Sequence, residues 1–435
     1  MIRALKERIH TKKAKISIIG MGYVGLPLAC AFARAGFHVH GIDIVAPKIR
    51  ALQNGKSHID DLSDADLKKV MQENRIDFSA SYKPIAKSDC IIICVPTPLG
   101  KTKEPDLSYI MAAVEETCLY LKSGQLLVLE STTYPGTTEE YVAPLIKSKT
   151  KLSPLKDVLL GFSPERVDPA NKDFDIVDIP KVVGGHGNQA GDCLEDLYQC
   201  IFGRVVRVSS AKAAEMVKLL ENTFRSVNIG MINEMAIICH KLNVDIWEVI
   251  DAAATKPFGF MPFYPGPGIG GHCINIDSMY LAWKVRLHDY EPRLIELAQT
   301  INDSMPQWVI ERVSRILNAK KKCINGAKVL VMGVSYKPNI QDIRESPSIA
   351  LIKELLSMGA NLEYHDPFVP QLKLDKQTLK SKPLNKARID SKDIILITTA
   401  HTAIDYGLLV KSSSPVLDTR NALKKYAKKK HIHLL

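Results

Sequence analysis

The feature that most constrains the fold lies near the start of the chain, where a short β-rich run leads directly into a glycine-rich turn. Residues 15–19 read KISII, residues 20–25 read GMGYVG, and Leu28, Ala29 and Ala33 continue as a helix. In such a unit the first glycine permits a tight turn, the second lets the backbone approach a pyrophosphate, and the third allows close packing of helix on strand. The segment therefore predicts an α/β fold with a dinucleotide bound at the helix N-terminus.

The choice of dinucleotide rests on Asp43, at the end of the next predicted strand. A carboxylate at that place accepts hydrogen bonds from a ribose diol and repels a 2′-phosphate, so we expect NAD rather than NADP. Lys48 lies nearby and weakens the charge argument. A plain βαβ turn with a capping aspartate is the structural alternative.

Strand patterns alternate with helical patterns over about the first 200 residues, which favours an open parallel sheet. The expected strands are 15–19, 38–43, 90–95, 126–130 and 158–162. The alternation returns near the C-terminus, with strands at 328–332, 361–364, 394–398 and 416–417 and a helix around 348–358. This second sheet resembles half of a doubly wound fold. It lacks a GxGxxG turn, so we expect no second dinucleotide there.

Residues 211–242 carry apolar side chains every three or four positions and no proline, which predicts one long helix. The apolar positions are Ala213, Val217, Leu220, Phe224, Val227, Met231, Met235 and Ile238. This length exceeds that of a typical globular helix, so we expect the helix to span between domains and to pack on a partner. A homodimer is the natural expectation.

The length of 435 residues predicts two or three domains, and 46% hydrophobic with 24% charged residues is typical of globular protein. The nine cysteines form no CxxC pairs, so we expect neither disulfides nor a metal site. The longest apolar runs are too short to cross a membrane and no signal-peptide core is present, which favours a cytoplasmic protein. The net charge of +11 gathers partly at the two ends, where solvated termini are a better interpretation than nucleic-acid binding.

The most unusual stretch is residues 266–273, which read GPGIGGHC. Four glycines around a Cys–His pair would let the backbone crowd a ligand and leave the Cys273 thiol exposed on a loop. A nucleophilic cysteine is the sharper hypothesis. A Gly/Pro-rich connection that happens to contain a cysteine is the alternative.

Lys218 and Asn222 lie four residues apart on one face of the long predicted helix. Such a pair can present an ammonium and an amide to a developing oxyanion, and a desolvated lysine can take part in proton transfer. Helix spacing alone would favour a solvated surface charge for Lys218.

Seven segments together resemble the UDP-glucose/UDP-N-acetyl-hexosamine 6-dehydrogenase family over nearly the whole chain and in family order. They are GMGYVGLPLA at 20–29, CVPTP at 94–98, ESTTYPGTT at 130–138, SPERVDPAN at 163–171, KLLENTFRSVN at 218–228, GPGIGGHCIN at 266–275 and SYKPNIQDIRESPS at 335–348. The cysteine loop and the Lys-x-x-x-Asn helix are the most specific. PERVDP and KPFGFMPFYPGPG, at 256–268, look most like the UDP-N-acetylglucosamine branch.

The resemblance implies two Rossmann-like doubly wound domains joined by the long helix. Residues 1–208 would bind NAD, residues 209–318 would form a helical dimerisation domain with the cysteine loop, and residues 319–435 would bind the UDP-sugar. The implied reaction is a four-electron oxidation of the C6 hydroxyl of a UDP-N-acetyl-hexosamine to the uronate, for surface polysaccharide precursors. A first hydride transfer to NAD would leave an aldehyde, which Cys273 would attack to give a thiohemiacetal. A second NAD would accept the next hydride and leave a thioester, which water would hydrolyse. UDP-N-acetylglucosamine is the expected sugar, with UDP-glucose and UDP-N-acetylmannosamine as alternatives.

The resemblance also implies individual roles. Lys218 and Asn222 would stabilise the oxyanion, Asp277 would assist proton transfer, and Thr132 and Glu165 would position water. NAD would contact Gly20, Gly22, Tyr23, Val24, Gly25, Asp43, Lys48, Thr97, Thr132 and Arg344. The UDP-sugar would contact Arg166, Val167, Lys218, Asn222, Arg225, Phe263, Tyr264, Gly268 and Lys337. Loop capping is the alternative for Asp277, Thr132 and Glu165, and a surface charge is the alternative for Arg225.

The chain departs from the family pattern next to the cysteine. Hexosamine relatives usually read HCIPxDP, whereas residues 272–278 read HCINIDS, so Asn275 and Ser278 replace two prolines. Losing those restricted φ angles should loosen the loop and affect efficiency more than reaction type. A non-catalytic NAD-binding sensor is the alternative from another class. The joint presence of Cys273, Lys218, Asn222 and Asp277 argues against it.

Overall fold

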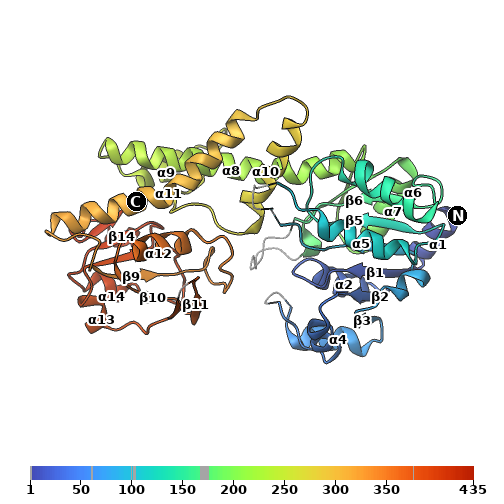
Figure 1. Ribbon diagram of the computed structural model, residues 1–435, viewed down its shortest axis with the longest axis horizontal. Helices are drawn as coiled ribbons and strands as arrows, with labels where there is room; N and C mark the ends of the chain where they lie inside the picture. The colour runs from blue at the N-terminus through green and yellow to red at the C-terminus, as the bar shows by residue number, and fades with distance from the viewer. Residues whose placement is uncertain (1, 60–61, 99, 101–103, 167–175, 376) are drawn as a thin grey trace. The chain divides into compact units, whose positions relative to one another are not determined.

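The computed structural model describes residues 2–59, 62–98, 100, 104–166, 176–375 and 377–435, and for His272 and Cys273 it describes the backbone alone. The chain divides into two compact units. The first comprises Met1–Glu221 with Met279–Tyr290, and the second comprises Asn222–Ser278 with Glu291–Leu435. Each unit contains its own sheet and helices, which confirms the α/β class (Figure 1).

The first unit is built on an eight-stranded sheet with the order β3-β2-β1-β4-β5-β6-β7-β8. The order of its first six strands is that of dinucleotide-binding folds, with the β1/β4 boundary as the switch point. All five predicted strands are confirmed, and β3, β7 and β8 were missed. The bounds are β1 Lys15–Ile19, β2 His38–Ile42, β3 Ile76–Ser79, β4 Cys90–Ile93, β5 Leu126–Leu129, β6 Leu159–Phe162, β7 Lys181–Gly185 and β8 Val205–Val208.

The expectation of a wholly parallel sheet is wrong at one boundary, because β7 pairs antiparallel with β6 through Gly161↔Gly185 and Phe162↔Gly184. Glycines permit this close pairing. A Cβ on Gly161 would lie 2.8 Å from the Gly184 carbonyl oxygen, and one on Gly185 would lie 2.1 Å from the Gly191 nitrogen. β8 then pairs parallel with β7 and extends the sheet.

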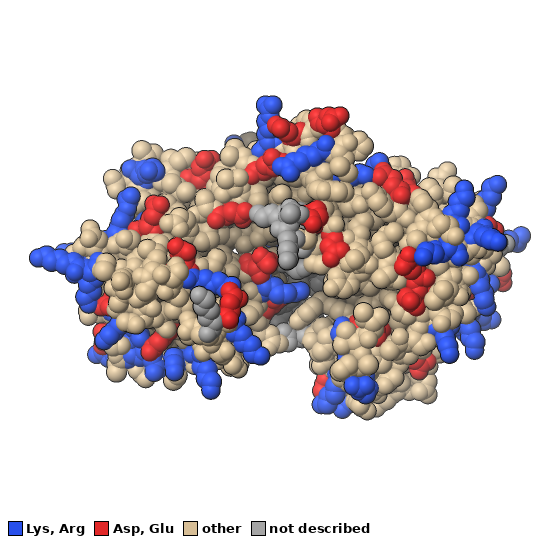
Figure 2. Space-filling model, viewed as in Figure 1, with Lys and Arg blue, Asp and Glu red and all other residues tan. Residues whose placement is uncertain are grey.

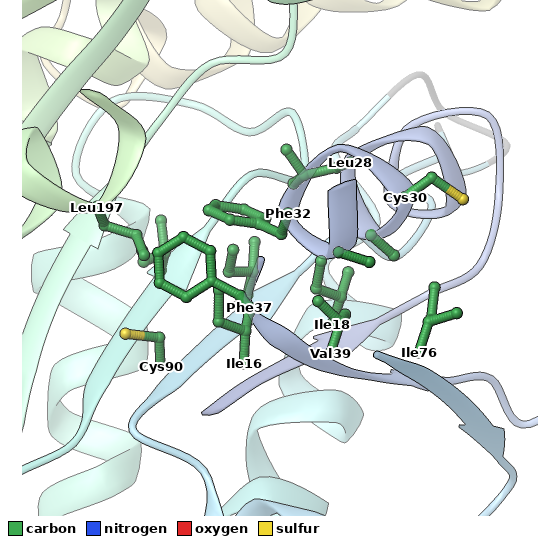
Figure 3. Close-up of a cluster of buried hydrophobic side chains, with 14 of the residues drawn as sticks. Ile16, Ile18, Leu28, Cys30, Phe32, Phe37, Val39, Ile76, Cys90 and Leu197 are labelled. Atoms are coloured by element: carbon green, nitrogen blue, oxygen red, sulfur yellow. The ribbon is translucent and has the colours of Figure 1, made fainter. Parts of the chain in front are cut away.

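Helices cover both faces of this sheet. Ile16, Ile18 and Val39 point toward α2, where Phe32 and Phe37 meet edge to face at 5.7 Å (Figure 3). The opposite face packs apolar side chains of α5 and α6 against the strands. The helices are α1 Ile2–His10, α2 Gly25–Arg34, α3 Ala46–Gln53, α4 Asp64–Gln72, α5 Ser108–Cys118, α6 Ala143–Thr150 and α7 Asn188–Gln199, with short helices η1 Lys83–Lys87, η2 Thr138–Val142 and η3 Ile176–Asp178.

The second unit has a parallel five-stranded sheet with the order β10-β9-β13-β14-β15. This is the other common doubly wound order, so the prediction of half a doubly wound fold is confirmed. β15 and the β11–β12 hairpin were missed. The bounds are β9 Lys328–Met332, β10 Asn361–His365, β11 Gln371–Lys373, β12 Thr378–Lys380, β13 Ile394–Ile397, β14 Val416–Asp418 and β15 Ile432–Leu434, with α12 Pro347–Ser357, α13 Lys386–Asp390, α14 Gly407–Val410 and η4 Lys424–Tyr426.

Long helices join these sheets along the chain. The predicted long helix is confirmed as α8, Ala211–Lys241, and it passes from the first unit into the second after Glu221. It is followed by α9 Ile246–Ala253, α10 His272–Arg286 and α11 Arg293–Ala319. The expectation that Cys273 lies on a loop is wrong, because α10 begins at His272 and places Cys273 in its first turn.

Two further findings concern the described part of the chain. None of its helices combines the length and apolar character needed to cross a membrane. The eight cysteines with described side chains form no disulfide, and five of them are buried: Cys30, Cys90, Cys118, Cys193 and Cys239.

Candidate active site

The glycine-rich turn after β1 has the geometry that a dinucleotide requires. Gly20 has a φ of +95°, and a Cβ there would lie 2.5 Å from the Cys94 carbonyl oxygen. A Cβ on Gly25 would lie 1.9 Å from the Gly20 carbonyl oxygen, so helix and strand can approach only without that atom. A Cβ on Gly22 would meet nothing within 4 Å. The residues present therefore fit NAD, because Gly22 leaves open space in front of the uncapped N-terminus of α2.

Asp43 lies directly after β2 and anchors this turn. Its Oδ2 accepts the Met21 N–H at 3.0 Å and the Lys48 ammonium at 2.6 Å, while Oδ1 accepts the Val45 N–H at 2.9 Å. The side chain is buried beside the turn. Lys48 thus forms an ion pair with Asp43. The positive charge of Lys48, which weakened the sequence argument for NAD over NADP, therefore has a partner in the structure.

Two other predicted NAD residues follow neighbouring strands of the same sheet. Thr97 follows β4 and is buried, and its carbonyl oxygen accepts the Tyr280 hydroxyl at 2.6 Å. Thr132 follows β5 and is half-buried. Because the carboxyl ends of parallel strands meet at one edge of a sheet, these residues share that edge with the glycine-rich turn.

Lys218 is buried rather than solvated, with only 7% of its surface exposed. Its ammonium donates a hydrogen bond to the backbone carbonyl of Glu165, which is itself 9% exposed. A buried ammonium needs such partners because losing water is costly. The structure therefore brings together two residues predicted from separate segments.

Asn222 lies one helical turn beyond Lys218 and contacts Asp277 of α10. Its amide nitrogen donates to Asp277 Oδ2, and the two side chains are 6% and 2% exposed. An Asn–Asp contact buried to this degree orients both groups. The structure therefore brings Asn222 and Asp277 together, and the predicted role of Asp277 in proton transfer stays a prediction.

The glycines before Cys273 lie directly against other protein atoms and leave no open space beside them. A Cβ on Gly270 would lie 2.6 Å from Tyr336 Cβ, and one on Gly271 would lie 2.8 Å from the Tyr336 ring. Gly271 also donates its N–H to the Arg344 carbonyl at 3.2 Å. Asn275 donates to the Ile269 carbonyl at 2.9 Å, so a hydrogen bond holds the loop at the position where the family pattern predicted a proline.

The remaining predicted substrate residues differ in their surroundings. Arg166 forms an ion pair with Glu221 at 2.6 Å, Phe263 packs edge to face on Phe224, and Tyr264 stacks on Trp247. Arg225 is exposed, Lys337 is half-buried, Gly268 has a φ of +125°, and the Arg344 guanidinium pairs with Asp342. Val167 lies outside the described residues, and so does the Cys273 side chain.

A buried charge cluster beside Glu165 was not predicted. The Lys181 ammonium donates to Glu130 Oε2 at 2.9 Å and to the Pro164 carbonyl at 3.3 Å, and Tyr198 donates to Glu130 Oε1. Burial raises the pKa of Glu130, and Lys181 opposes that rise. Both residues stand at strand ends, where charged residues are common, so the sequence held no signal for the cluster.

Two more residues near the predicted segments were missed. Glu215 of α8 is fully buried and accepts the N–H groups of Gly136 and Thr138, which belong to the loop that carries Thr132. Arg420 packs against Gly266 and donates to the Thr398 carbonyl at 2.9 Å. Glu215 precedes Lys218 by three positions, so helix spacing could have placed it on the same face.

Charge is not gathered in one stripe. On the face drawn in Figure 2, basic side chains are interspersed with acidic ones. Many basic residues are also paired, such as Arg8 with Asp89 and Lys424 with Asp251. This distribution gives no support to a polyanion-binding surface on that face.

Comparisons with known proteins agree with this geometry. Three models of the UDP-glucose/GDP-mannose dehydrogenase family match the chain: the NAD binding domain at residues 14–202, the central domain at 212–304 and the UDP binding domain at 330–425. A UDP-N-acetyl-D-glucosamine 6-dehydrogenase of Pseudomonas aeruginosa is 35% identical over 82% of this chain and 84% of its own length.

Relatives named for another sugar are about as similar. A UDP-N-acetyl-D-mannosamine dehydrogenase of Methanocaldococcus jannaschii is 34% identical over 89% of this chain and 86% of its own. Among solved structures, the UDP-D-ManNAc dehydrogenase of Pyrococcus horikoshii has a TM-score of 0.88 at 30% identity, covering 97% of this chain and 98% of that one.

Proposed function

Because the chain belongs to the UDP-glucose/GDP-mannose dehydrogenase family, we propose that it oxidises the C6 hydroxyl of UDP-N-acetylglucosamine to a carboxylate through a thioester on Cys273. The chain is an NAD-dependent UDP-sugar dehydrogenase. The sugar, the covalent intermediate and the roles of single residues are our proposal. The observation that carries it is the pair of buried contacts along α8, Lys218 to Glu165 and Asn222 to Asp277.

NAD, held by the glycine-rich turn with Asp43, Lys48, Thr97 and Thr132, would accept hydride from C6. Lys218 supplies a positive charge and Asn222 a neutral donor, so a developing oxyanion at C6 is stabilised by both. The Lys218 ammonium is held in place by its hydrogen bond to the Glu165 backbone carbonyl. Asp277, held by Asn222, accepts the proton that the substrate hydroxyl loses.

Cys273 forms a carbon–sulfur bond with the C6 aldehyde to give a thiohemiacetal, and its thiol proton passes to a neighbouring base. A second NAD would then accept hydride from C6 as the hydroxyl proton leaves, which gives the thioester. Water then cleaves the thioester and returns the thiol. Glu165 and Thr132 position that water. For Glu165, support comes from a cavity of about 10 Å³ that it lines with Glu130 and Lys181, a volume at the lower limit for one water.

The same proposal includes a homodimer formed along α8 and the three-part division at residues 208 and 318. Five apolar residues of the predicted stripe remain 37% to 64% exposed: Leu220, Phe224, Met231, Met235 and Ile238. An uncovered apolar stripe of this kind supports a partner surface. The UDP-sugar would contact Arg166, Val167, Arg225, Phe263, Tyr264, Gly268 and Lys337, with Arg344 directed to NAD.

The test is to incubate the enzyme and NAD with UDP-N-acetylglucosamine, UDP-N-acetylmannosamine and UDP-glucose and to follow NADH absorbance. We expect two NADH for each UDP-N-acetylglucosamine consumed and the highest kcat/KM with that sugar. UDP-N-acetylmannosamine is the second candidate, because relatives named for it are as similar. A clear preference for either other sugar would refute the sugar assignment, and one NADH per sugar would refute the four-electron reaction.

A further inference from the structure

Polar side chains line one face of the sheet where apolar ones are normal. β1 is an inner strand, and inner strands of parallel sheets usually bury apolar side chains on both faces. Ile16, Ile18 and Val39 follow this rule on the face toward α2 (Figure 3). Side chains alternate along a strand, so the other face takes Lys15 and Ser17 of β1 with His38 and His40 of β2.

These four residues lie side by side. The register of β1 and β2 pairs Lys15 with His38 and Ser17 with His40. They occupy the amino-terminal halves of the two strands, whereas the glycine-rich turn and Asp43 follow the carboxyl ends. A five-residue strand is about 16 Å long, so this polar face is a separate place from the dinucleotide turn.

A cavity of about 320 Å³ opens over this polar face. Its basic lining comes from three elements: Lys15 of β1, His38 and His40 of β2, and Lys83 and Lys87 of η1. Pro84 adds apolar surface. The volume lies at the lower end of the range for small-molecule sites, which suits a ligand of a few carbon atoms with one charged group.

The positive charge of this cavity is not cancelled by carboxylates. In the part of the chain that the structure describes, none of the ammonium groups of Lys15, Lys83 and Lys87 forms an ion pair. Asp77 lies 3.6 Å from His38, and Asp89 is occupied by the Lys15 N–H and the Arg8 guanidinium, each at 2.9 Å. Three lysines therefore face the cavity, and the two nearby carboxylates, Asp77 and Asp89, already have partners.

His40 adds a neutral group that can hydrogen bond. It is half-buried, and burial lowers its pKa. Its Nε2 lies 3.2 Å from Ser79 Oγ, which leaves the second ring nitrogen for another partner. Ammonium groups and imidazoles together are the donors that bind phosphate oxygens in proteins.

We propose that this cavity is a second anion site, which binds the phosphate group of a small phosphate ester such as a sugar phosphate. Lys83 and Lys87 approach the phosphate from η1, Lys15 from β1, and His38 and His40 from β2. Pro84 contacts the organic part. The site does not depend on the proposed sugar or on the covalent mechanism, because none of its residues takes part in them.

The test uses the full-length enzyme saturated with NAD and UDP, so that the nucleotide sites of the active centre are filled. Glucose 1-phosphate and inorganic phosphate are the probes, titrated by calorimetry. We expect one saturable site per chain for glucose 1-phosphate, and we expect it to bind glucose 1-phosphate at least as tightly as inorganic phosphate. In Lys83→Ala/Lys87→Ala the affinity should fall at least about tenfold, because two charge-assisted contacts are lost.

Lys425→Ala/Lys428→Ala is the matched control, since it removes the same charge from exposed lysines of the other unit. Its affinity should equal that of the wild type, and both variants should keep wild-type dehydrogenase kcat. His40→Gln, which retains the lysines, should also weaken binding, and the wild-type His38 and His40 imidazole NMR signals should shift on titration. Absence of a saturable site, or equal weakening in both lysine variants, would overturn the proposal whatever the dehydrogenase assay shows.

Discussion

The carboxylate of Asp43 accepts the Met21 N–H of the dinucleotide turn, the Val45 N–H after β2 and the Lys48 ammonium. Asp43→Asn keeps the size of the side chain and removes its charge. We expect kcat/KM with NAD to fall about tenfold to a hundredfold, since a charged hydrogen bond contributes about 1.5–3 kcal/mol. The gap between NAD and NADP should narrow. Steady-state rates with both cofactors measure this, with Asp192→Asn on α7 as control. Equal wild-type rates with NAD and NADP would contradict the role of Asp43.

Glu215 should make stability depend on pH. Burial raises its pKa from 4.5 to about 7, although three donors from Gly136 and Thr138 oppose the rise. Because its pKa is raised, Glu215 holds its proton more tightly in the folded state than in the unfolded state. This stabilisation is fully present below pH 4.5, and it is lost as pH rises through 7. The loss amounts to about 3 kcal/mol.

Glu215→Gln cannot ionise, so its free energy of unfolding should lack this component. Between pH 4.5 and 8 the wild-type value minus the variant value should fall by up to about 3 kcal/mol. Denaturant unfolding at a series of pH values measures it. The exposed Glu116→Gln is the control and should follow the wild type. A wild-type-minus-variant difference that stays constant with pH would show that Glu215 does not titrate in this range.

Cys273 carries the covalent step of the proposal. Cys273→Ala should stop formation of the uronate, with at most a little aldehyde-level product, because hydride transfer from the alcohol needs a base rather than the sulfur. Cys273→Ser forms an oxygen ester that lacks thioester activation, so an adduct should accumulate. Mass spectrometry of the peptide containing residue 273, after mixing with substrate and NAD, detects it. Full turnover by Cys273→Ala would end the thioester hypothesis.

At the scale of elements, α8 is a 31-residue helix with two kinds of surface. Glu215, Lys218 and Asn222 are buried, and the apolar stripe from Leu220 to Ile238 is partly uncovered. Hydrophobic patches left open in this way drive association. The helix therefore presents catalytic candidates on one side and the proposed partner surface on another.

Met231→Glu/Met235→Glu places two charges on that stripe. We expect the dimer to dissociate at least tenfold more readily, because burying an unpaired carboxylate costs more than about 1.4 kcal/mol. Sedimentation velocity over a range of concentrations measures the change. Leu119→Glu, another exposed apolar residue outside α8, should leave assembly unchanged. A wild type that sediments as a monomer at every concentration would remove the dimer from the proposal.

The cysteine loop shows how elements from distant segments constrain each other. Gly270 and Gly271 were expected to let the backbone approach a ligand, and in the structure Tyr336 occupies the space beside them. In the first turns of α10, Asn275 donates a hydrogen bond to the Ile269 carbonyl. This bond offsets the loss of the proline that the family pattern predicts at position 275. Local sequence could not show either contact, because both partners are defined by folding.

At the scale of the whole molecule, the two sheets follow the two common doubly wound orders. Strands with continuous apolar runs, such as CIII at β4 and LLVL at β5, were predicted within a residue or two. The missed strands β3, β8 and β15 are only three or four residues long, too short for alternation to stand out in the sequence. α11 was not predicted either, since polar Gln299 and Asn302 are buried along it and Pro306 interrupts its pattern.

The sequence alone determined the dinucleotide turn, the long helix and the identity of most candidate site residues, because each depends on local spacing or on a motif that retains its residue types. Tertiary structure alone decided the burial of Lys218, its bond to the Glu165 carbonyl and the pairing of Asn222 with Asp277. It also decided the Glu130–Lys181 cluster and the basic cavity over β1 and β2. Each of these joins residues far apart in the chain, and only packing determines which distant polar groups lose water together.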